Sequence, residues 1–497
     1  MAEATGGRVG TVAPEIPSGN LPPVTYRDMP EALPLRRIMG PGVIIAATSM
    51  GSGEYVLWPY IASQVGLGVM WAALVGIGTQ FFINMEVERY AISTGETAIA
   101  GFTRLWKPWW VLFVLFAILP NIWPGFVTSS MTAFTFVFGL GEGAVVPLSI
   151  IALISVGLAL TLSPVVYQFV EKFQTVAIAI MVVFFAIAVF AGTRAQDWGS
   201  LAAGFGSFGR IPGFGLPASE TVTAAVLLGA LAFAGGGGCN NLTIANWIRD
   251  KGFGMGAYIP RIVSPVTGEE ESVPSTGYFF PQDEENVRRW RGWWRVANLE
   301  QFLTFFLIGF VGIVVLSVLA YSTVYGENVG EELDFIRAEG EVLQETVAPW
   351  FGTFFWFAGF VILVSTTIGN FDYVSRITAD AVKINWLGES RFWSESKIYA
   401  ATIWLLVVNG IVIILTITSQ PIVLLVISSV LSAFVMFVYS ILLIKLNRGV
   451  LPNPIKMGNG RLAAMVWSTL LFGVFSAIVI YNQIISPLLG TAPLLGG

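Results

Sequence analysis

Residues 40–63 read GPGVIIAATSMGSGEYVLWPYIAS, and residues 231–247 read LAFAGGGGCNNLTIANW. Both lie in apolar runs long enough to cross a membrane, but glycines and polar residues interrupt them. Four consecutive glycines, each about 1 kcal/mol less favourable than alanine in a helix, disfavour continuous helix over 235–238. A single glycine pair often serves close helix packing instead. Four glycines followed by two asparagines favour unwound backbone, which survives at this depth only where protein or a water-filled cavity satisfies its polar groups. The two stretches therefore predict two broken helices.

The composition excludes several classes of protein. Hydrophobic residues make up 55% of the 497 residues and charged residues 11%, against about 25% charged in soluble domains. One cysteine, Cys239, and no histidine exclude a disulfide framework, an imidazole metal ligand and a histidine proton relay. Neither a nucleophile and base pair nor a cofactor fingerprint is present. We therefore expect no enzyme activity, no cofactor and no nucleic-acid partner.

The apolar runs predict an all-α polytopic membrane protein, because they do not alternate as strands of a closed barrel would. At about 20 residues per crossing, the chain holds eleven spans. They cover residues 38–63, 67–90, 109–138, 147–166, 173–193, 221–247, 299–325, 348–371, 398–418, 422–444 and 462–485.

The basic residues orient these spans. With the amino terminus inside, only Arg194, Arg210 and Arg337 of the 26 Lys and Arg residues lie outside. This asymmetry places the amino terminus in the cytoplasm and the carboxyl terminus outside the cell membrane. Residues 1–37, rich in Pro, Gly and polar residues, are predicted to be a disordered cytoplasmic leader, and residues 38–497 a single transporter domain in the lipid bilayer.

The two broken spans also predict an internal repeat. Span 1 runs outward and span 6 inward, five spans apart, as in inverted-repeat transporters, where discontinuous helices meet at the midplane and present free backbone groups to substrate. We expect a LeuT-like five-plus-five fold, with repeats at 38–193 and 221–444 and an extra span at 462–485.

Glu54 is the charged residue deepest in a predicted span. Burying it costs several kcal/mol unless it is partnered, so it is a functional candidate, although a protonated or internally paired structural carboxylate is the alternative. The predicted substrate-binding residues are Thr48, Gly51, Ser52, Gly53, Glu54, Gly235, Gly238, Asn240 and Asn241. Glu54, Asn240 and Asn241 are the candidate metal ligands among them. Glu54 at the start of the outer half-helix disfavours anionic substrates.

The chain resembles the Nramp family of metal-ion transporters over most of residues 38–485. The resemblance is carried by Gly40-Pro41-Gly42, Glu88-Arg89-Tyr90, Thr94-Gly95-Glu96-Thr97, Asn241-Leu242 and Ser428 to Phe437. It implies eleven or twelve spans on a five-plus-five inverted repeat and transport of a metal ion.

The chain departs from that family at the metal site. The family's Asp-Pro-Gly-Asn motif is matched by Gly51-Ser52-Gly53-Glu54, and its Met-Pro-His-Asn motif by Gly238-Cys239-Asn240-Asn241. The aspartate and the soft methionine sulfur are both absent, which argues against the usual transition-metal selectivity. Span 3 has no acidic residue and span 9 no arginine, so proton coupling of the family's kind is not expected.

These observations favour a transporter that moves a hard divalent cation, magnesium or manganese, through an oxygen-lined site by alternating access. A carrier of a small organic cation or amino acid on the same fold is the alternative, because glycines also make room for a larger solute. A non-transporting sensor is a third possibility. We expect a monomer.

Two further groups of residues have an interpretation from the sequence. Four charges lie near the predicted cytoplasmic ends of spans 6 and 8 and are either gate pairs or solvated helix ends: Arg249, Asp250, Arg376 and Asp380. The basic aromatic run Arg288 to Arg295 is interpreted as a headgroup anchor.

Overall fold

A computed structural model describes residue 16 and residues 19–209, 222–259, 262, 265–266, 277–327, 333–388, 390–416 and 421–491. Within this part of the chain, nine helices are long and apolar enough to cross a membrane, with lengths from 21 to 41 residues. At 1.5 Å per residue the shortest reaches about 32 Å, enough for a hydrocarbon core about 30 Å thick. The protein is an all-α integral membrane protein, as predicted.

The first half of the chain supplies the predicted spans 1 to 5. Span 1 comprises α2 (Pro41–Ser49), η1 (Met50–Leu57) and α3 (Trp58–Val65), and span 2 comprises η2 (Leu67–Val69) and α4 (Met70–Thr94). After the short α5 (Ala98–Leu105) come α6 (Trp109–Ile118), η3 (Leu119–Asn121) and α7 (Gly125–Phe138), then η4 (Glu142–Ala144) and α8 (Val145–Leu162), α9 (Val166–Ile187) with η5 (Ala188–Gly192), and α10 (Ala195–Gly206).

The second half supplies the remaining spans. Span 6 comprises α11 (Ala224–Ala232) and α12 (Gly238–Lys251), and span 7 lies in the continuous α13 (Glu284–Gln301), η7 (Phe302–Leu307) and α14 (Ile308–Val324). They are followed by α15 (Asp334–Thr346), α16 (Pro349–Asn385), α17 (Glu395–Thr416), α18 (Pro421–Gly449), α19 (Asn459–Ile480), η8 (Tyr481–Ile485) and α20 (Ser486–Leu489).

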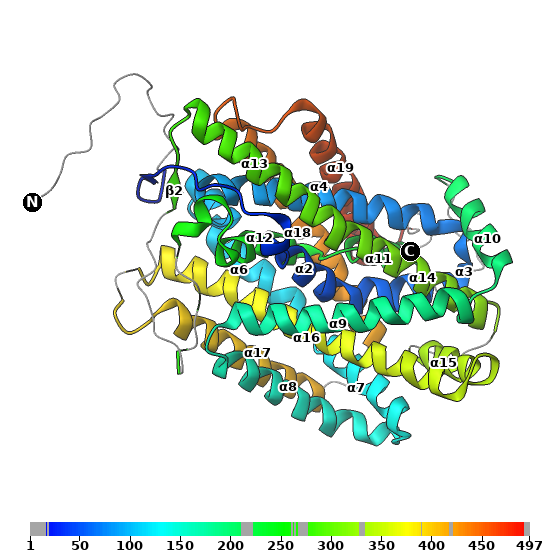
Figure 1. Cartoon of the computed structure of the whole chain (residues 1–497). Helices are drawn as coiled ribbons and strands as arrows, with labels where there is room; N and C mark the ends of the chain where they lie inside the picture. The colour runs from blue at the N-terminus through cyan, green and yellow to red at the C-terminus, as the bar shows by residue number, and fades with distance from the viewer. Residues whose placement is uncertain are drawn as a thin grey trace, which may run out of the picture.

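The helices form one bundle in which α2, α11 and α12 lie in the interior, with α8 and α17 on one side and α13 and α19 on the opposite side (Figure 1). These interior helices belong to the predicted spans 1 and 6, which are not among the nine long apolar helices of the described residues. The total of eleven crossings therefore stays a prediction.

Apolar side chains cover both the inside and the outside of the bundle. Ile151 and Leu158 on α8, and Leu470 and Val474 on α19, are exposed although they are large and hydrophobic. A soluble protein seldom exposes such a continuous apolar surface, whereas in a bilayer it faces lipid. The polar groups of the backbone are satisfied within the helices, as the lipid environment requires.

The described part of the predicted leader differs from the expectation of disorder. Residues 25–26 form β1 (Thr25–Tyr26), which pairs in parallel with β2 (Tyr278–Phe279). Met29 is fully buried, and its backbone N–H donates to Asn286 Oδ1 at 2.7 Å. This segment is ordered because apolar residues spaced among the prolines find partners on the chain just before span 7. Residues 1–15 and 17–18 of the leader lie outside the described residues.

The basic aromatic run is also placed differently. The sequence predicts an anchor in the headgroup region, whereas the run lies in α13, which begins at Glu284. Trp290 and Trp293 are buried, and their indole N–H groups donate to Ser93 Oγ and to the carbonyl of Pro30, both at 2.9 Å. Since aromatic residues recur here every three or four positions, they form one helical face that packs into the protein.

Candidate functional site

Span 6 is broken where the sequence predicts it. α11 ends at Ala232, α12 begins at Gly238, and residues 233–237 between them are not helical. Gly235 and Gly237 have φ angles of 149° and 69°, in the region that side chains other than glycine rarely adopt. The glycine run therefore allows the chain to leave one helix and enter the next.

Gln80 of α4 satisfies the backbone on both sides of this break. Its amide Nε2 donates to the carbonyls of Leu231 at 3.2 Å and Ala232 at 2.8 Å, and its Oε1 accepts from the backbone N–H of Gly237 at 3.0 Å. These backbone groups would otherwise be unpaired helix-end groups inside the membrane. The sequence interpretation missed Gln80, although an amide in the middle of an apolar span was a signal for it.

The interruption in span 1 takes another form. The chain does not unwind at residues 51–54 but passes through an eight-residue π-helix, Met50–Leu57, between α2 and α3. Residues in a π-helix bond one position further along the chain, which widens the helix, and such segments occur frequently at functional sites. Span 1 therefore departs from regular α-helix at the predicted position without exposing two free half-helix ends.

The two irregular segments touch at Gly53. A β-carbon at this position would lie 1.5 Å from the carbonyl oxygen of Phe233, so no larger residue fits between the two backbones. Gly51, two residues earlier, faces α16 instead, where its backbone N–H donates to Thr366 Oγ1 at 3.1 Å. The glycines of span 1 thus allow close packing, and one of them brings span 1 against the break in span 6.

Glu54 is fully buried next to this contact. Ser49 Oγ donates to its Oε1 at 3.2 Å, whereas its Oε2 has no hydrogen-bond partner among the described residues. A β-carbon on Gly309 of α14 would lie 3.5 Å from Oε1, so the carboxylate is directed toward span 7. An incompletely partnered carboxylate at this depth needs an explanation, and a bound cation or proton supplies one.

Of the two asparagines of span 6, Asn241 contacts α4 and Asn240 contacts the break. Asn241 Nδ2 donates to Asn84 Oδ1 at 2.6 Å and to Gln80 Oε1 at 3.3 Å, and Asn240 Nδ2 donates to the carbonyl of Gly236 at 3.3 Å. The side-chain oxygen of each asparagine is buried and has no partner in the described structure. Within the described residues, no hydrogen bond joins either asparagine to Glu54.

The other predicted site residues are distributed around the same region. Thr48 Oγ1 donates to the carbonyl of Ile44 at 2.8 Å and lies 3.4 Å from Gln174 Nε2, toward α9. Gly238 packs against Ser432 of α18. Ser52 is in the π-helix, but its side chain lies outside the described part of the structure. The predicted residues therefore surround the crossing of spans 1 and 6 rather than converge on one point.

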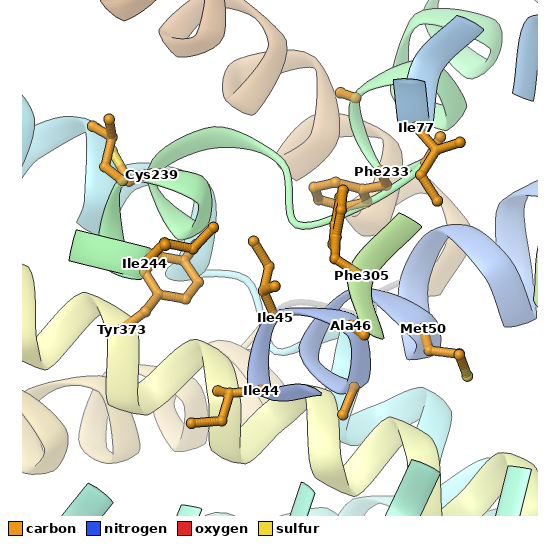
Figure 2. Close-up of a cluster of buried hydrophobic side chains, with 14 of the residues drawn as sticks. Ile44, Ile45, Ala46, Met50, Ile77, Phe233, Cys239, Ile244, Phe305 and Tyr373 are labelled. Atoms are coloured by element: carbon orange, nitrogen blue, oxygen red, sulfur yellow. The ribbon is translucent and has the colours of Figure 1, made fainter. Parts of the chain in front are cut away.

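Apolar side chains cover the break itself. Ile45 lies against Gly236 and Phe305 against Gly235, and Figure 2 shows Ile45 and the rings of Phe233 and Phe305 around the segment that connects α11 and α12. No group of three or more Asp, Glu, Cys or His residues able to hold a metal ion occurs among the described residues. A cation bound here would take its ligands mainly from amide and backbone oxygens.

A small cavity borders the break on its other side. It lies between α7, α8, α16 and α17, and its wall residue Phe126 packs against Phe233 with ring centroids 6.2 Å apart. Asn121 and Asn370 add amides to the lining, and the space has room for about one water molecule. The cavity is much smaller than an amino acid.

A buried ion-pair network lies at the predicted cytoplasmic ends of spans 6 and 8. Arg249 Nη1 lies 2.8 Å from Asp380, and its Nη2 3.2 Å from Glu395 of α17. Arg376 pairs with Asp250 and, at 2.8 Å, with Asp372. The four charges singled out in the sequence are therefore paired and not solvated, and the network contains two carboxylates, Asp372 and Glu395, that sequence reasoning missed.

Solved structures of other proteins identify the fold of this chain. No protein-family model matches the sequence, and no curated protein matches it. Two mutants of the manganese transporter of Eremococcus coleocola have similar structures, with TM-scores of 0.66 and 0.65, 13% sequence identity, and alignments over 95% of this chain and 92% of that transporter. MhsT in complex with L-phenylalanine aligns with a TM-score of 0.53 and 14% identity over 91% of this chain and 99% of that one. The chain thus has the LeuT fold of membrane transporters, as predicted.

Proposed function

We propose that this protein is an Nramp-related transporter that moves a hard divalent cation, magnesium or manganese, by alternating access and without proton coupling. One observation carries the proposal: each of the three predicted side-chain ligands keeps one buried oxygen that has no hydrogen-bond partner in the described part of the chain. These atoms are Glu54 Oε2, Asn240 Oδ1 and Asn241 Oδ1. Buried polar atoms are normally paired, so three free acceptors around one crossing of helices favour a positively charged ligand.

The chemistry of these atoms favours a hard ion. One carboxylate and two amide oxygens resemble the oxygen sets that bind magnesium and manganese, and magnesium in particular keeps several water ligands. The single cysteine of the chain, Cys239, is buried and its sulfur lies 4.0 Å from the carbonyl of Phe113. It is directed toward α6, away from the three oxygens.

The oxygens of Glu54, Asn240 and Asn241 do not converge on one point in this structure, which is compatible with a transport cycle in which helices move. Ile45 and Phe305 cover the break, so binding requires α2 or the inner half of span 7 to move. Motion of one helix group against another around a central site is how transporters of this fold alternate their access. The ion-pair network on the predicted cytoplasmic side supplies the contacts that close that end.

Transport of an organic cation or amino acid is the second candidate. It is favoured by the likeness to MhsT in complex with L-phenylalanine. The cavity beside the break, with room for about one water molecule, favours an ion over such a solute. Since the similar structures named above are those of transporters, an enzyme activity has no support from the comparisons.

The proposal is tested with purified protein in liposomes. Uptake of magnesium and manganese is followed with trapped indicator dyes, together with internal pH, for the wild type, Glu54→Gln and the control Glu341→Gln. Glu341 is exposed on α15. We expect uptake without acidification that Glu54→Gln abolishes and Glu341→Gln preserves. If neither ion enters, the metal proposal fails, and uptake of amines or amino acids instead would establish the second candidate.

A further inference from the structure

One polar face of α4 continues beyond the break toward the predicted cytoplasmic side. Gln80, Asn84 and Glu88 are spaced four residues apart and therefore lie on the same side of the helix, and all three are fully buried. The first two contact the break in span 6 and Asn241. Eight residues of helix place Glu88 about 12 Å further along the axis.

Glu88 has an unusual environment for a buried carboxylate. Neither of its oxygens has a hydrogen-bond partner of normal geometry among the described residues, although the side-chain amide of Gln301 lies beside the carboxylate, and Oε1 of Gln301 has no partner either. All three atoms are acceptors. The missing partner is therefore a hydrogen-bond donor or a cation.

The neighbouring charges compensate Glu88 only in part. Glu300 lies close to it, but its Oε1 accepts the backbone N–H groups of Gly40 and Gly42, at 3.2 and 2.9 Å, at the start of α2. Its Oε2 accepts from Gln301 Nε2 at 3.4 Å. Arg461, the cationic neighbour of Glu88, lies 3.7 Å from Glu86, which also pairs with Arg89 at 2.9 Å, and its Nη1 makes no hydrogen bond within the described residues. The carboxylates of Glu86, Glu88 and Glu300 therefore face only two guanidinium groups, and the pocket keeps acceptor oxygens and a surplus of one negative charge.

We propose that Glu88 and Gln301, with Glu300 beside them, form a second binding site for the transported divalent cation, between the break in span 6 and the cytoplasm. This inference rests on the proposed function. Magnesium and manganese bind through one or two carboxylates and keep water in the remaining positions, so the Glu88 carboxylate and one amide oxygen form a sufficient protein contribution. The amides of Gln80, Asn84 and Asn241 line the way from the central site to this one.

The test counts bound manganese ions by electron paramagnetic resonance, in which bound Mn²⁺ loses the signal of the free ion. We expect two ions per wild-type protein, one in Glu88→Gln and one in Glu54→Gln, with two retained in the control Glu341→Gln. Melting temperatures verify that each variant is folded. Gln301→Glu adds a carboxylate to the site and is expected to lower the second Kd by about tenfold, which keeps the test valid if Glu88→Gln does not fold.

The outcomes separate the two proposals. If wild type binds one ion that Glu54→Gln removes and Glu88→Gln keeps, the proposed function stands and the second site is overturned, with the charge of Glu88 balanced by a proton. If the one ion is lost in Glu88→Gln but not in Glu54→Gln, the site at Glu88 is real and the central site fails. If no ion binds, or if Gln301→Glu leaves the second Kd unchanged, the second site is overturned.

Discussion

The backbone of Gly53 in span 1 lies directly against the carbonyl oxygen of Phe233 in span 6, 180 positions further along the chain. A β-carbon on Gly53 would lie 1.5 Å from that oxygen, well inside the contact distance of two atoms. Since the oxygen belongs to the backbone at the end of α11, it has no flexible side chain to move away. This contact joins the two segments on which the proposed cation site depends.

Gly53→Ala is expected to impair the protein strongly. The added methyl group must push the spans apart, and overpacking of a core costs about 1–3 kcal/mol or more. We expect a lower melting temperature in detergent and a loss of cation uptake. Gly143→Ala is the matched control, because no atom lies within 4 Å of a β-carbon at that position. Equal melting temperatures for the two variants would show that the contact is looser than the structure indicates.

Gln80 is expected to be essential for the stability of the break. Gln80→Leu leaves the carbonyls of Leu231 and Ala232 and the N–H of Gly237 without their side-chain partner, at about 1–3 kcal/mol for each group left unsatisfied. The variant should therefore unfold at a clearly lower temperature. Gln196→Leu, the same change at an exposed position of α10, should leave the melting temperature unchanged. A Gln80→Leu protein as stable as wild type would mean that water or another group replaces the amide.

The sequence predicted the fold more completely than the site. Glycines 235–238 and the opposite directions of spans 1 and 6 were sufficient to predict a broken span 6 and the LeuT fold, because few residues other than glycine adopt the φ angles found there. The form of the irregularity in span 1 was not predictable in the same way. Whether Gly51 to Glu54 unwinds or forms a π-helix depends on contacts with Phe233 and Thr366, which are far away in the sequence.

The partners of the site residues were equally unpredictable from the sequence. Glu54 was identified from its position alone, but its direction toward Gly309 depends on how α14 packs. Gln80 was overlooked although it lies in the middle of a predicted span. Glu88 and Glu300 were not identified as site residues, because a polar residue near the end of a span is expected to be solvated until the packing shows it to be buried. The buried pairs of Arg249 and Arg376 were ambiguous for the same reason.

The ion-pair network provides a test of gating. Arg376 is fully buried between Asp372 and Asp250, and removing one partner of a buried pair costs about 3–5 kcal/mol. We expect Arg376→Gln to open the predicted cytoplasmic side more often. Cys239 is the single cysteine of the chain and is buried on α12, so its labelling by a maleimide reports this opening. The labelling rate should rise at least about tenfold, which corresponds to 1.4 kcal/mol.

The control for this experiment is Arg337→Gln. Arg337 pairs with Glu341 on the exposed face of α15, with both side chains more than half exposed, and such pairs contribute about 0–1 kcal/mol. Its labelling rate should equal that of wild type. If Arg376→Gln labels no faster than Arg337→Gln, the network is a structural element and not a gate.

Glu339 is expected to make the docking of α15 depend on pH. It lies in a helix outside the membrane-spanning segments, it is 1% exposed, and its Oε1 has no partner among the described residues. Burial raises the pKa of this carboxyl well above its ordinary value, so the docked helix holds a proton that the undocked helix releases more readily. The docked state is therefore fully stabilised below the ordinary pKa of a glutamate and loses this stability as pH rises toward the raised pKa.

Hydrogen exchange of residues 334–346, corrected for the intrinsic pH dependence of exchange, should show weaker protection at pH 8 than at pH 5. Glu339→Gln should abolish that difference, whereas Glu341→Gln, at an exposed position of the same helix, should retain it. Equal protection at both pH values in the wild type would mean that Glu339 keeps one protonation state throughout this range.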